Sequence, residues 1–192
     1  MRKVKLQMQL SLDGFVAGPN AEMDWMTMNW GEDINSHVKE ITEAVDCILL
    51  GHQLAQGFVP TWQAMAADSA TAQDFVHKMV DTPKLVFSKT KLIADADWKN
   101  VNFATQSPDK EITDLKKMQG GDIMVYGGAS LVSQLIAQNL IDEYHLFINP
   151  ILMGNGMPIF KEINNHLKLE LISSKTFECG IVVLCYKPAT NN

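Results

Sequence analysis

The chain has 192 residues, of which 46% are hydrophobic and 20% are charged. These proportions are those of an average globular protein, so they exclude wholesale disorder. The chain has 16 Lys and Arg against 22 Asp and Glu, a formal net charge of −6. A mildly acidic chain without a basic run argues against nucleic acid or an anionic membrane as the main partner.

Cysteine and histidine usage gives no sign of a metal centre. The three cysteines form no C-x-x-C pair and the five histidines are scattered, so we expect neither a disulfide framework nor a structural metal. Glutamines interrupt the basic N-terminal residues at once, and no window approaches 18 apolar residues. We therefore expect no signal peptide and no membrane span, and a soluble cytoplasmic protein.

The first half of the chain alternates between strand-like and helix-like patterns. Apolar residues alternate with polar ones over residues 4–12, which predicts a strand that ends at the turn signal Asp13-Gly14. The stretch 15–30 has no period and is interpreted as a long loop. The elements expected next are a helix from Ile34 to Val45, a buried strand at 47–50, a loop holding Gly57 and Pro60, a helix over 72–80 and a strand at 85–87.

The second half continues this alternation and then changes character. Ser107 and Pro108 suit the start of a helix that Gly120-Gly121 ends. A buried strand at 123–126, a helix over 131–136 and strands at 142–149, 167–177 and 181–187 follow. The whole pattern predicts one α/β domain over residues 1–192, with a mostly parallel central sheet flanked by helices and antiparallel strands at the C-terminal edge.

Ligands of open parallel sheets bind beyond the carboxyl ends of the strands. Three of the expected strands end in Gly51-His52, Ser88-Lys89 and Gly127-Gly128-Ala129-Ser130. The glycine pair suits a phosphate group, because glycine allows close approach and the following helix presents free N–H groups. A tight turn without a ligand explains the pair equally well. Ser88, Lys89 and a protonated His52 also suit a phosphate, whereas an ordinary solvated turn is the common alternative.

The stretch between the first strand and the first helix offers other candidates. Asp24, Glu32 and Asp33 are candidate proton donors, although capping or surface carboxylates are the commoner role. Trp25 and Trp30, together with nearby methionines, could line a pocket for a flat heterocycle, and ordinary core packing explains them as well.

Taken together, these motifs resemble the dihydrofolate reductase-like family that includes the C-terminal reductase domain of the riboflavin-biosynthesis protein RibD. The likeness is strongest to stand-alone bacterial members and covers nearly the whole chain. It is carried by residues 11–19 (SLDGFVAGP), Asp24-Trp25, 48–51 (ILLG), 84–90 (KLVFSKT), 125–131 (VYGGASL), 140–143, 149–156 and 158–160.

The resemblance implies an eight-stranded, mostly parallel sheet with an antiparallel C-terminal strand, NADPH as hydride donor, and a homodimer. By match to the family motifs, the cofactor pyrophosphate lies beside Gly127, Gly128, Ala129 and Ser130, and the adenosine 2′-phosphate lies near Ser88 and Lys89. Val16 and Ala17 then lie near the nicotinamide, and Trp25 lies close to the substrate. The helix that carries the proton-donating acid of true dihydrofolate reductases starts near Asp33, which is the catalytic candidate.

The chain departs from the family pattern after Gly51. The family usually has Arg next and Thr two residues later, where this chain has His52 and Leu54. Losing one charge-assisted hydrogen bond costs about 1.5–3 kcal/mol. We therefore expect NADPH binding to be weakened, rerouted through Lys89 and His52, or shifted toward NADH.

Three functional readings remain open from the sequence. The first is an NADPH-dependent reductase of a small heterocycle, with 5-amino-6-(5-phosphoribosylamino)uracil as first substrate and folate as second. The second keeps hydride transfer but acts on another carbonyl or imine. The third is a non-catalytic nucleotide-binding or dimeric scaffold with a degenerate reductase site. The deaminase signature of bifunctional RibD is absent from the sequence.

Overall fold

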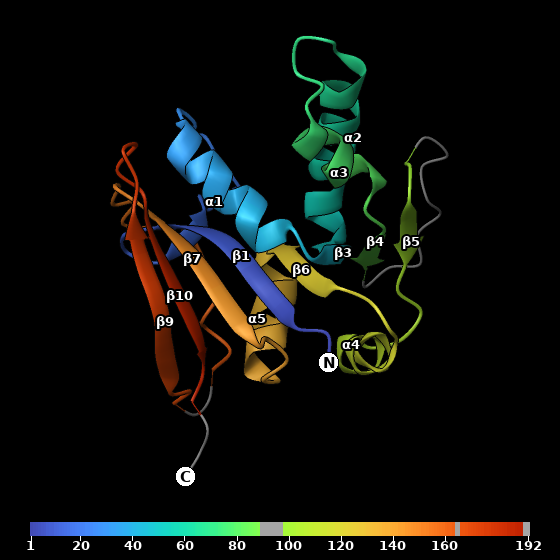
Figure 1. The fold of residues 1–192 in the computed structure, drawn as a ribbon. Helices are drawn as coiled ribbons and strands as arrows, with labels where there is room; N and C mark the ends of the chain where they lie inside the picture. Colours follow the sequence, from blue (N-terminus) through green and yellow to red (C-terminus); the bar gives the residue numbers. More distant parts are fainter. Residues whose placement is uncertain (89–97, 164–165, 190–192) are drawn as a thin grey trace.

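The computed structural model describes residues 1–88, 98–163 and 166–189. Its centre is an eight-stranded sheet with the strand order β5-β4-β3-β6-β1-β7-β10-β9 (Figure 1). The six strands from β5 to β7 are parallel, and β10 and β9 are antiparallel additions. These strands are β1 (Val4–Ser11), β3 (Val45–Gly51), β4 (Lys84–Phe87), β5 (Val101–Phe103), β6 (Asp122–Gly127), β7 (Glu143–Asn149), β9 (Leu169–Thr176) and β10 (Val182–Pro188). This confirms the predicted α/β class and the antiparallel C-terminal edge.

Helices cover both faces of the sheet because its central strands bury side chains on both sides. Ile48, Leu49 and Leu50 of β3 are all fully buried. Leu49 packs in the same cluster as α5, while Ile48 and Leu50 pack with α2. The helices are α1 (Glu32–Thr42), α2 (His52–Ala67), α3 (Asp74–Asp81), α4 (Pro108–Lys117) and α5 (Ala129–Ala137). A run of apolar residues without alternation is what a strand buried on two faces requires.

The prediction of a loop holding Gly57 and Pro60 was wrong, because both residues lie inside α2. Ala55 and Val59 are one helical turn apart and fully buried against β3 and β4. This tertiary burial outweighs the poor helix propensity of glycine and proline.

Three shorter features also differ from expectation. The stretch 15–30, predicted to be a loop, begins with the short strand β2 (Phe15–Ala17), which pairs with β8 (Met157–Pro158). The edge strand β5 gave no apolar run and was missed. Helix α4 ends at Lys117, before the glycine pair that was expected to stop it.

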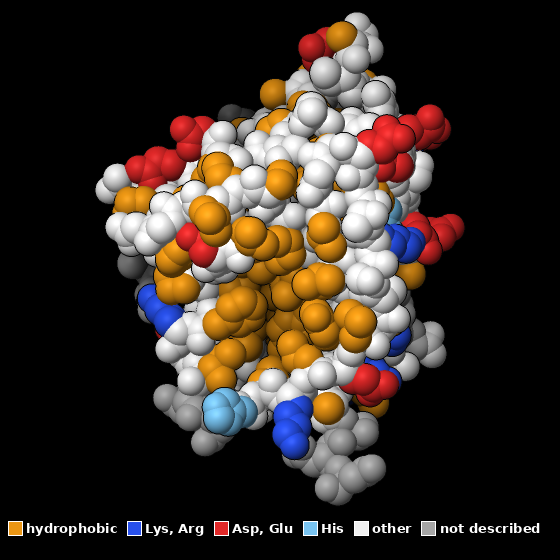
Figure 2. All heavy atoms as spheres, turned by 90° about the vertical axis from the view of Figure 1, so that its left-hand side faces the viewer, with side chains coloured by type: hydrophobic (Ala, Val, Ile, Leu, Met, Phe, Trp, Pro, Cys, Tyr) orange, Lys and Arg blue, Asp and Glu red, His pale blue; other side chains and the backbone are white. Residues whose placement is uncertain are grey.

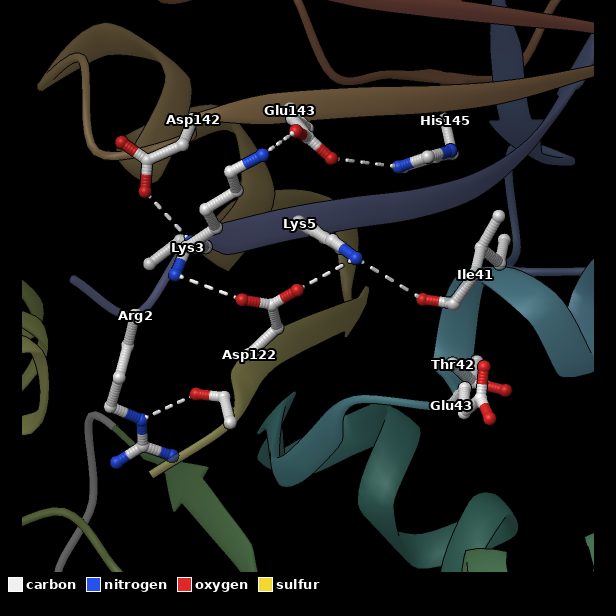
Figure 3. A network of polar contacts seen from close by, with 12 residues as sticks. Arg2, Lys3, Lys5, Ile41, Thr42, Glu43, Asp122, Asp142, Glu143 and His145 are labelled. Carbon is white, nitrogen blue, oxygen red and sulfur yellow. Dashed lines mark hydrogen bonds and ion pairs between the residues drawn. The ribbon is translucent and has the colours of Figure 1, made fainter. Parts of the chain in front are cut away.

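Salt bridges join the amino ends of the parallel strands, at the edge opposite the carboxyl ends (Figure 3). Lys3 of the N-terminal segment bonds Glu143 of β7 at 2.6 Å, and Lys5 of β1 bonds Asp122 of β6 at 2.7 Å. Arg2 pairs with Asp46 at the start of β3. Burial lowers the pKa of His145, which lies 3.5 Å from Glu143. This network joins the N-terminal segment to β3, β6 and β7 at the amino ends of the strands. The loops described below follow the opposite, carboxyl ends.

The C-terminal hairpin leaves one region of the sheet without a helix over it. Figure 2 looks onto the side of the molecule where β9 and β10 lie and shows a broad hydrophobic area that is hollowed near its centre. Leu169, Leu171 and Ile172 of β9 are exposed. Among the described helices, none is long and apolar enough to cross a membrane.

Candidate functional site

Two strand ends meet in backbone contact at the carboxyl edge of the sheet. Leu50 of β3 pairs in register with Gly127 of β6. The next residue, Gly51, is the N-cap of α2, and Gly128 is the N-cap of α5. A Cβ atom on Gly51 would lie only 2.8 Å from the backbone nitrogen of Gly128, and Gly127 has a φ of +133°. Only glycine satisfies both the close approach and this backbone conformation.

The same geometry fits the pyrophosphate of a dinucleotide. Neither α2 nor α5 has a side-chain cap on its first N–H groups. Two helix amino ends, each with the positive end of its dipole, therefore lie at neighbouring strand ends. Ala129 and Ser130 form the first turn of α5, and Ser130 is exposed.

Two side chains in the first turn of α2, Leu54 and His52, contact different neighbours. Leu54 lies over the glycine pair, with its Cδ2 atom 3.1 Å from the position of a Cβ on Gly127. His52 instead faces two aromatic rings, with ring centroids 6.5 Å from Trp98 and 6.4 Å from Phe103. An apolar side chain thus occupies the position where the resemblance leads one to expect a hydroxyl donor.

Ser88 lies at the same edge as Gly51 and His52. Strand β4 pairs with β3, with Phe87 opposite Gly51, and Ser88 follows Phe87 directly. Lys89, the cation predicted to act with Ser88, lies outside the described residues.

A second group of predicted residues gathers at the ends of β1 and β7. Val16 and Ala17 are buried in β2. Asp13 holds the neighbouring loop in place, because its carboxylate accepts hydrogen bonds from the backbone N–H groups of Met153 at 3.1 Å and Gly154 at 2.7 Å. The Ser11 hydroxyl, 2.7 Å from Asp13, lowers the pKa of that carboxyl most strongly. Because β1 is the neighbour of β6, this group lies beside the glycine pair.

Asn149 ties the loop that carries Trp25 to the sheet. Its side chain accepts a hydrogen bond from the backbone N–H of Thr27 at 3.0 Å and donates one to Gln9 at 2.8 Å. The indole nitrogen of Trp25 is buried and has no partner among the described residues. Asn149 and Asp13 were not predicted to organise the site, although both are polar residues at the ends of apolar strands.

Asp33 has a structural role at the start of α1, in keeping with the capping role that the sequence analysis gave as the commoner one, and a second bond that no local pattern indicated. One carboxylate oxygen accepts the backbone N–H of Ile34 at 2.8 Å, and the other accepts that of Glu178 at 2.9 Å. The side chain therefore joins the start of α1 to the turn between β9 and β10. Its assignment as proton donor stays a prediction.

The described residues contain no group of three or more His, Cys, Asp or Glu that could hold a metal ion. The chemistry that the edge can support is binding of an anionic cofactor through backbone N–H groups, beside a partly apolar compartment at the ends of β1 and β7.

Comparison with known proteins places this arrangement in a family. The model of the RibD C-terminal domain matches residues 2–183. The uncharacterised protein YyaP of Bacillus subtilis is 31% identical over 188 residues, which are 96% of this chain and 94% of YyaP. The chain belongs to the RibD C-terminal domain family.

Solved structures show that the fold is shared more widely. A putative riboflavin biosynthesis protein from Shewanella sp. PV-4 superposes with a TM-score of 0.73 at 20% identity, over 99% of this chain and all of that one. A deaminase/5-amino-6-(5-phosphoribosylamino)uracil reductase from Thermotoga maritima gives 0.66 at 14% identity, over 98% of this chain and 57% of that one. Dihydrofolate reductase from Enterococcus faecalis, complexed with NADP(H), gives 0.58 at 13% identity, over 98% and 97%. The fold is dihydrofolate reductase-like, and the family supports a reductase-type function.

Proposed function

We propose that the protein is an NADPH-dependent reductase that transfers hydride to a small heterocyclic substrate. The observation that carries this proposal is the contact between Gly51 and Gly128, which brings the uncapped amino ends of α2 and α5 together at neighbouring strand ends. A reductase-type function of the family and the binding of NADP(H) by a protein of the same fold support it. The candidate substrates are 5-amino-6-(5-phosphoribosylamino)uracil or a related pyrimidine, then folate, then another carbonyl or imine.

Bound NADPH would supply the hydride, and the chain would supply position and protection from water. Backbone N–H groups at the starts of α2 and α5 would hold the pyrophosphate, with Ser88 near the 2′-phosphate. Strand β2, with Val16 and Ala17, would border the nicotinamide. The loop held by Asn149 would place Trp25 over the substrate and exclude solvent. Asp33 is the candidate for holding the proton that the reduced substrate takes up.

Titration of the purified protein with NADPH, NADH and NADP⁺, followed by thermal unfolding, tests the cofactor. A ligand at about 100 times its Kd adds about 2.7 kcal/mol of stability, which raises the Tm of a domain of this size by roughly 5–10 °C. We expect a rise with NADPH and NADP⁺. No rise with any of the three would contradict the proposal.

The scaffold alternative rests on Leu54, whose side chain lies over the glycine pair. If the site has degenerated, the parent protein should not bind NADPH, and the double substitution His52→Arg, Leu54→Thr should restore binding. Tight binding by the parent protein would remove this alternative. Each charge-assisted hydrogen bond that is restored should strengthen binding roughly tenfold to a hundredfold.

A second copy of this chain is the proposed partner. The exposed hydrophobic face of β9 and β10 supports it, because an apolar face of this extent at the edge of a sheet favours association. The proposed state is a homodimer.

A further inference from the structure

Three large apolar side chains stand exposed around the ends of β1 and β7. Leu12 is 64% exposed, Met28 is 76% exposed and Leu152 is 70% exposed. They come from three different loops, which one backbone hydrogen bond and the side chain of Asn149 hold together. The N–H of Leu12 donates to the carbonyl of Ile151 at 2.8 Å, so Leu12 and Leu152 are held close to each other. These three residues are called the apolar rim below.

Met28 joins the apolar rim through Asn149. The N–H of Thr27, next to Met28, donates to the Asn149 side chain, and Asn149 pairs in register with Ser11, next to Leu12. The apolar rim therefore lies at the strand ends from which β2 and the Trp25 loop lead. It offers exposed methyl, methylene and thioether surface there.

The charged side chains of Lys, Arg, Asp and Glu in these loops are all carboxylates. The sequence has no Lys or Arg between Lys5 and Lys39, or between Lys117 and Lys161. These two stretches contain the loops after β1 and β7, the Trp25 loop and the Gly127-Gly128 turn. Residues 12–33 carry the carboxylates Asp13, Glu22, Asp24, Glu32 and Asp33. A substrate phosphate beside residues 12–33 would face repulsion from these carboxylates, and neither stretch supplies a Lys or Arg to offset it.

The nearest basic side chains of α1 and β9 are committed or distant. Lys175 of β9 bonds Glu40 at 3.2 Å and lies 3.1 Å from His37. Lys39 belongs to the last turn of α1, whereas the Trp25 loop leads into its first turn. Proteins normally recognise a phosphate monoester through Arg or Lys, or through a helix amino end. The amino ends of α2 and α5 belong to the proposed cofactor site, and the amino end of α1 carries the carboxylates of Glu32 and Asp33 in its first turn, which disfavour an anion there.

We propose that the substrate of this protein is a heterocycle that carries an apolar substituent and no phosphate, with the substituent packed on Leu12, Met28 and Leu152. This inference rests on the proposed reductase function and narrows its substrate class, because it sets aside the phosphoribosyl compound among the candidate substrates and keeps those without a phosphate. It separates this chain from an enzyme that reduces a phosphoribosyl substrate, although the fold and the cofactor site are shared.

Calorimetric titration of the protein saturated with NADP⁺ tests the inference with three ligands that share one aminouracil ring. The ring carries a ribosyl phosphate, a ribosyl group or a benzyl group on its 6-amino nitrogen. We expect the ribosyl form to bind with the same Kd as the phosphoribosyl form or with a lower Kd. The benzyl form should bind at least tenfold more tightly than the ribosyl form. The Kd of the benzyl form should not change between 50 and 500 mM salt, because no ion pair forms.

Two outcomes would overturn the inference. One is a phosphoribosyl ligand that binds tenfold or more tightly than its ribosyl counterpart, which is the gain expected from a charge-assisted bond. The other is a benzyl form that does not bind. Failure of NADP⁺ itself to bind would instead refute the proposed function, so the two failures are distinguishable.

A matched pair of variants locates the effect on the apolar rim. Leu152→Lys should weaken the benzyl form and strengthen the phosphoribosyl form, each at least fivefold, while NADP⁺ affinity stays unchanged. Met118→Lys adds the same charge at an exposed position after α4 and should change neither Kd. Equal effects of the two variants would show that the apolar rim does not bind the substituent.

Discussion

Several polar side chains at the carboxyl edge accept hydrogen bonds from the backbone N–H groups of loops that are distant in sequence. Asp13 holds Met153 and Gly154, Asn149 holds Thr27, and Asp33 holds Glu178. Each of these side chains fixes a loop that has no regular secondary structure of its own to order it. Loss of one such bond should therefore loosen a whole segment of the site.

Asp33 can be tested as proton donor and as structural anchor separately. If it supplies the proton, Asp33→Asn should lower kcat by about a hundredfold or more and remove an acid limb from the pH–rate profile. If it only anchors the hairpin, Asp33→Asn keeps an acceptor oxygen, and stability should fall by about 1 kcal/mol with an unchanged pH profile. Urea unfolding and the pH dependence of NADPH oxidation give the two readouts.

Lys84 should make stability depend on pH. Its ammonium is buried and donates to the carbonyls of Val80 at 2.8 Å and Thr82 at 2.7 Å. Burial lowers the pKa of Lys84 to about 8 from 10.5. Between these values the unfolded chain binds more protons than the folded one, so this group makes the protein more stable as pH rises from 8 to 10.5.

The variant Lys84→Met lacks the titrating group. From pH 8 to 10, the unfolding free energy of the parent protein should therefore rise relative to that of the variant. Chemical unfolding at several pH values measures it. Lys117→Met, at an exposed ion pair, is the control and should show no such shift. A flat difference for Lys84→Met would contradict the assigned pKa.

Among the secondary-structure elements, the close contact between the starts of α2 and α5 constrains the shape of the site. Gly51→Ala would place a methyl group 2.8 Å from the Gly128 nitrogen, so one of the two turns would have to move. We expect Gly51→Ala to destabilise the protein and weaken NADPH binding by at least tenfold.

Gly57→Ala is the matched control, because nothing lies within 4 Å of a Cβ at this position inside α2. It should leave NADPH binding unchanged and stabilise the protein by about 0.5–1 kcal/mol. Unfolding curves and cofactor titration of both variants make the comparison. Equal cofactor affinity for both would show that the turn does not shape the phosphate site.

At the scale of the whole molecule, the uncovered face of β9 and β10 determines the expected assembly. Leu171→Lys places a charge on this face, where Leu171 is 53% exposed, and should convert a dimer into a monomer in sedimentation experiments. Met118→Lys should leave the dimer intact. A parent protein that sediments as a monomer at micromolar concentration would contradict the proposed homodimer.

The sequence by itself determined the α/β class, the antiparallel C-terminal strands and the glycines at the strand ends, because periodicity and turn residues act over a few neighbouring positions. Only the tertiary structure decided that β3 and β6 are neighbours, so that Gly51 meets Gly128. It also decided that Pro60 lies inside a helix and that Asp33 bonds Glu178, 145 residues away. These outcomes depend on burial and on pairing between distant segments, which no local pattern records.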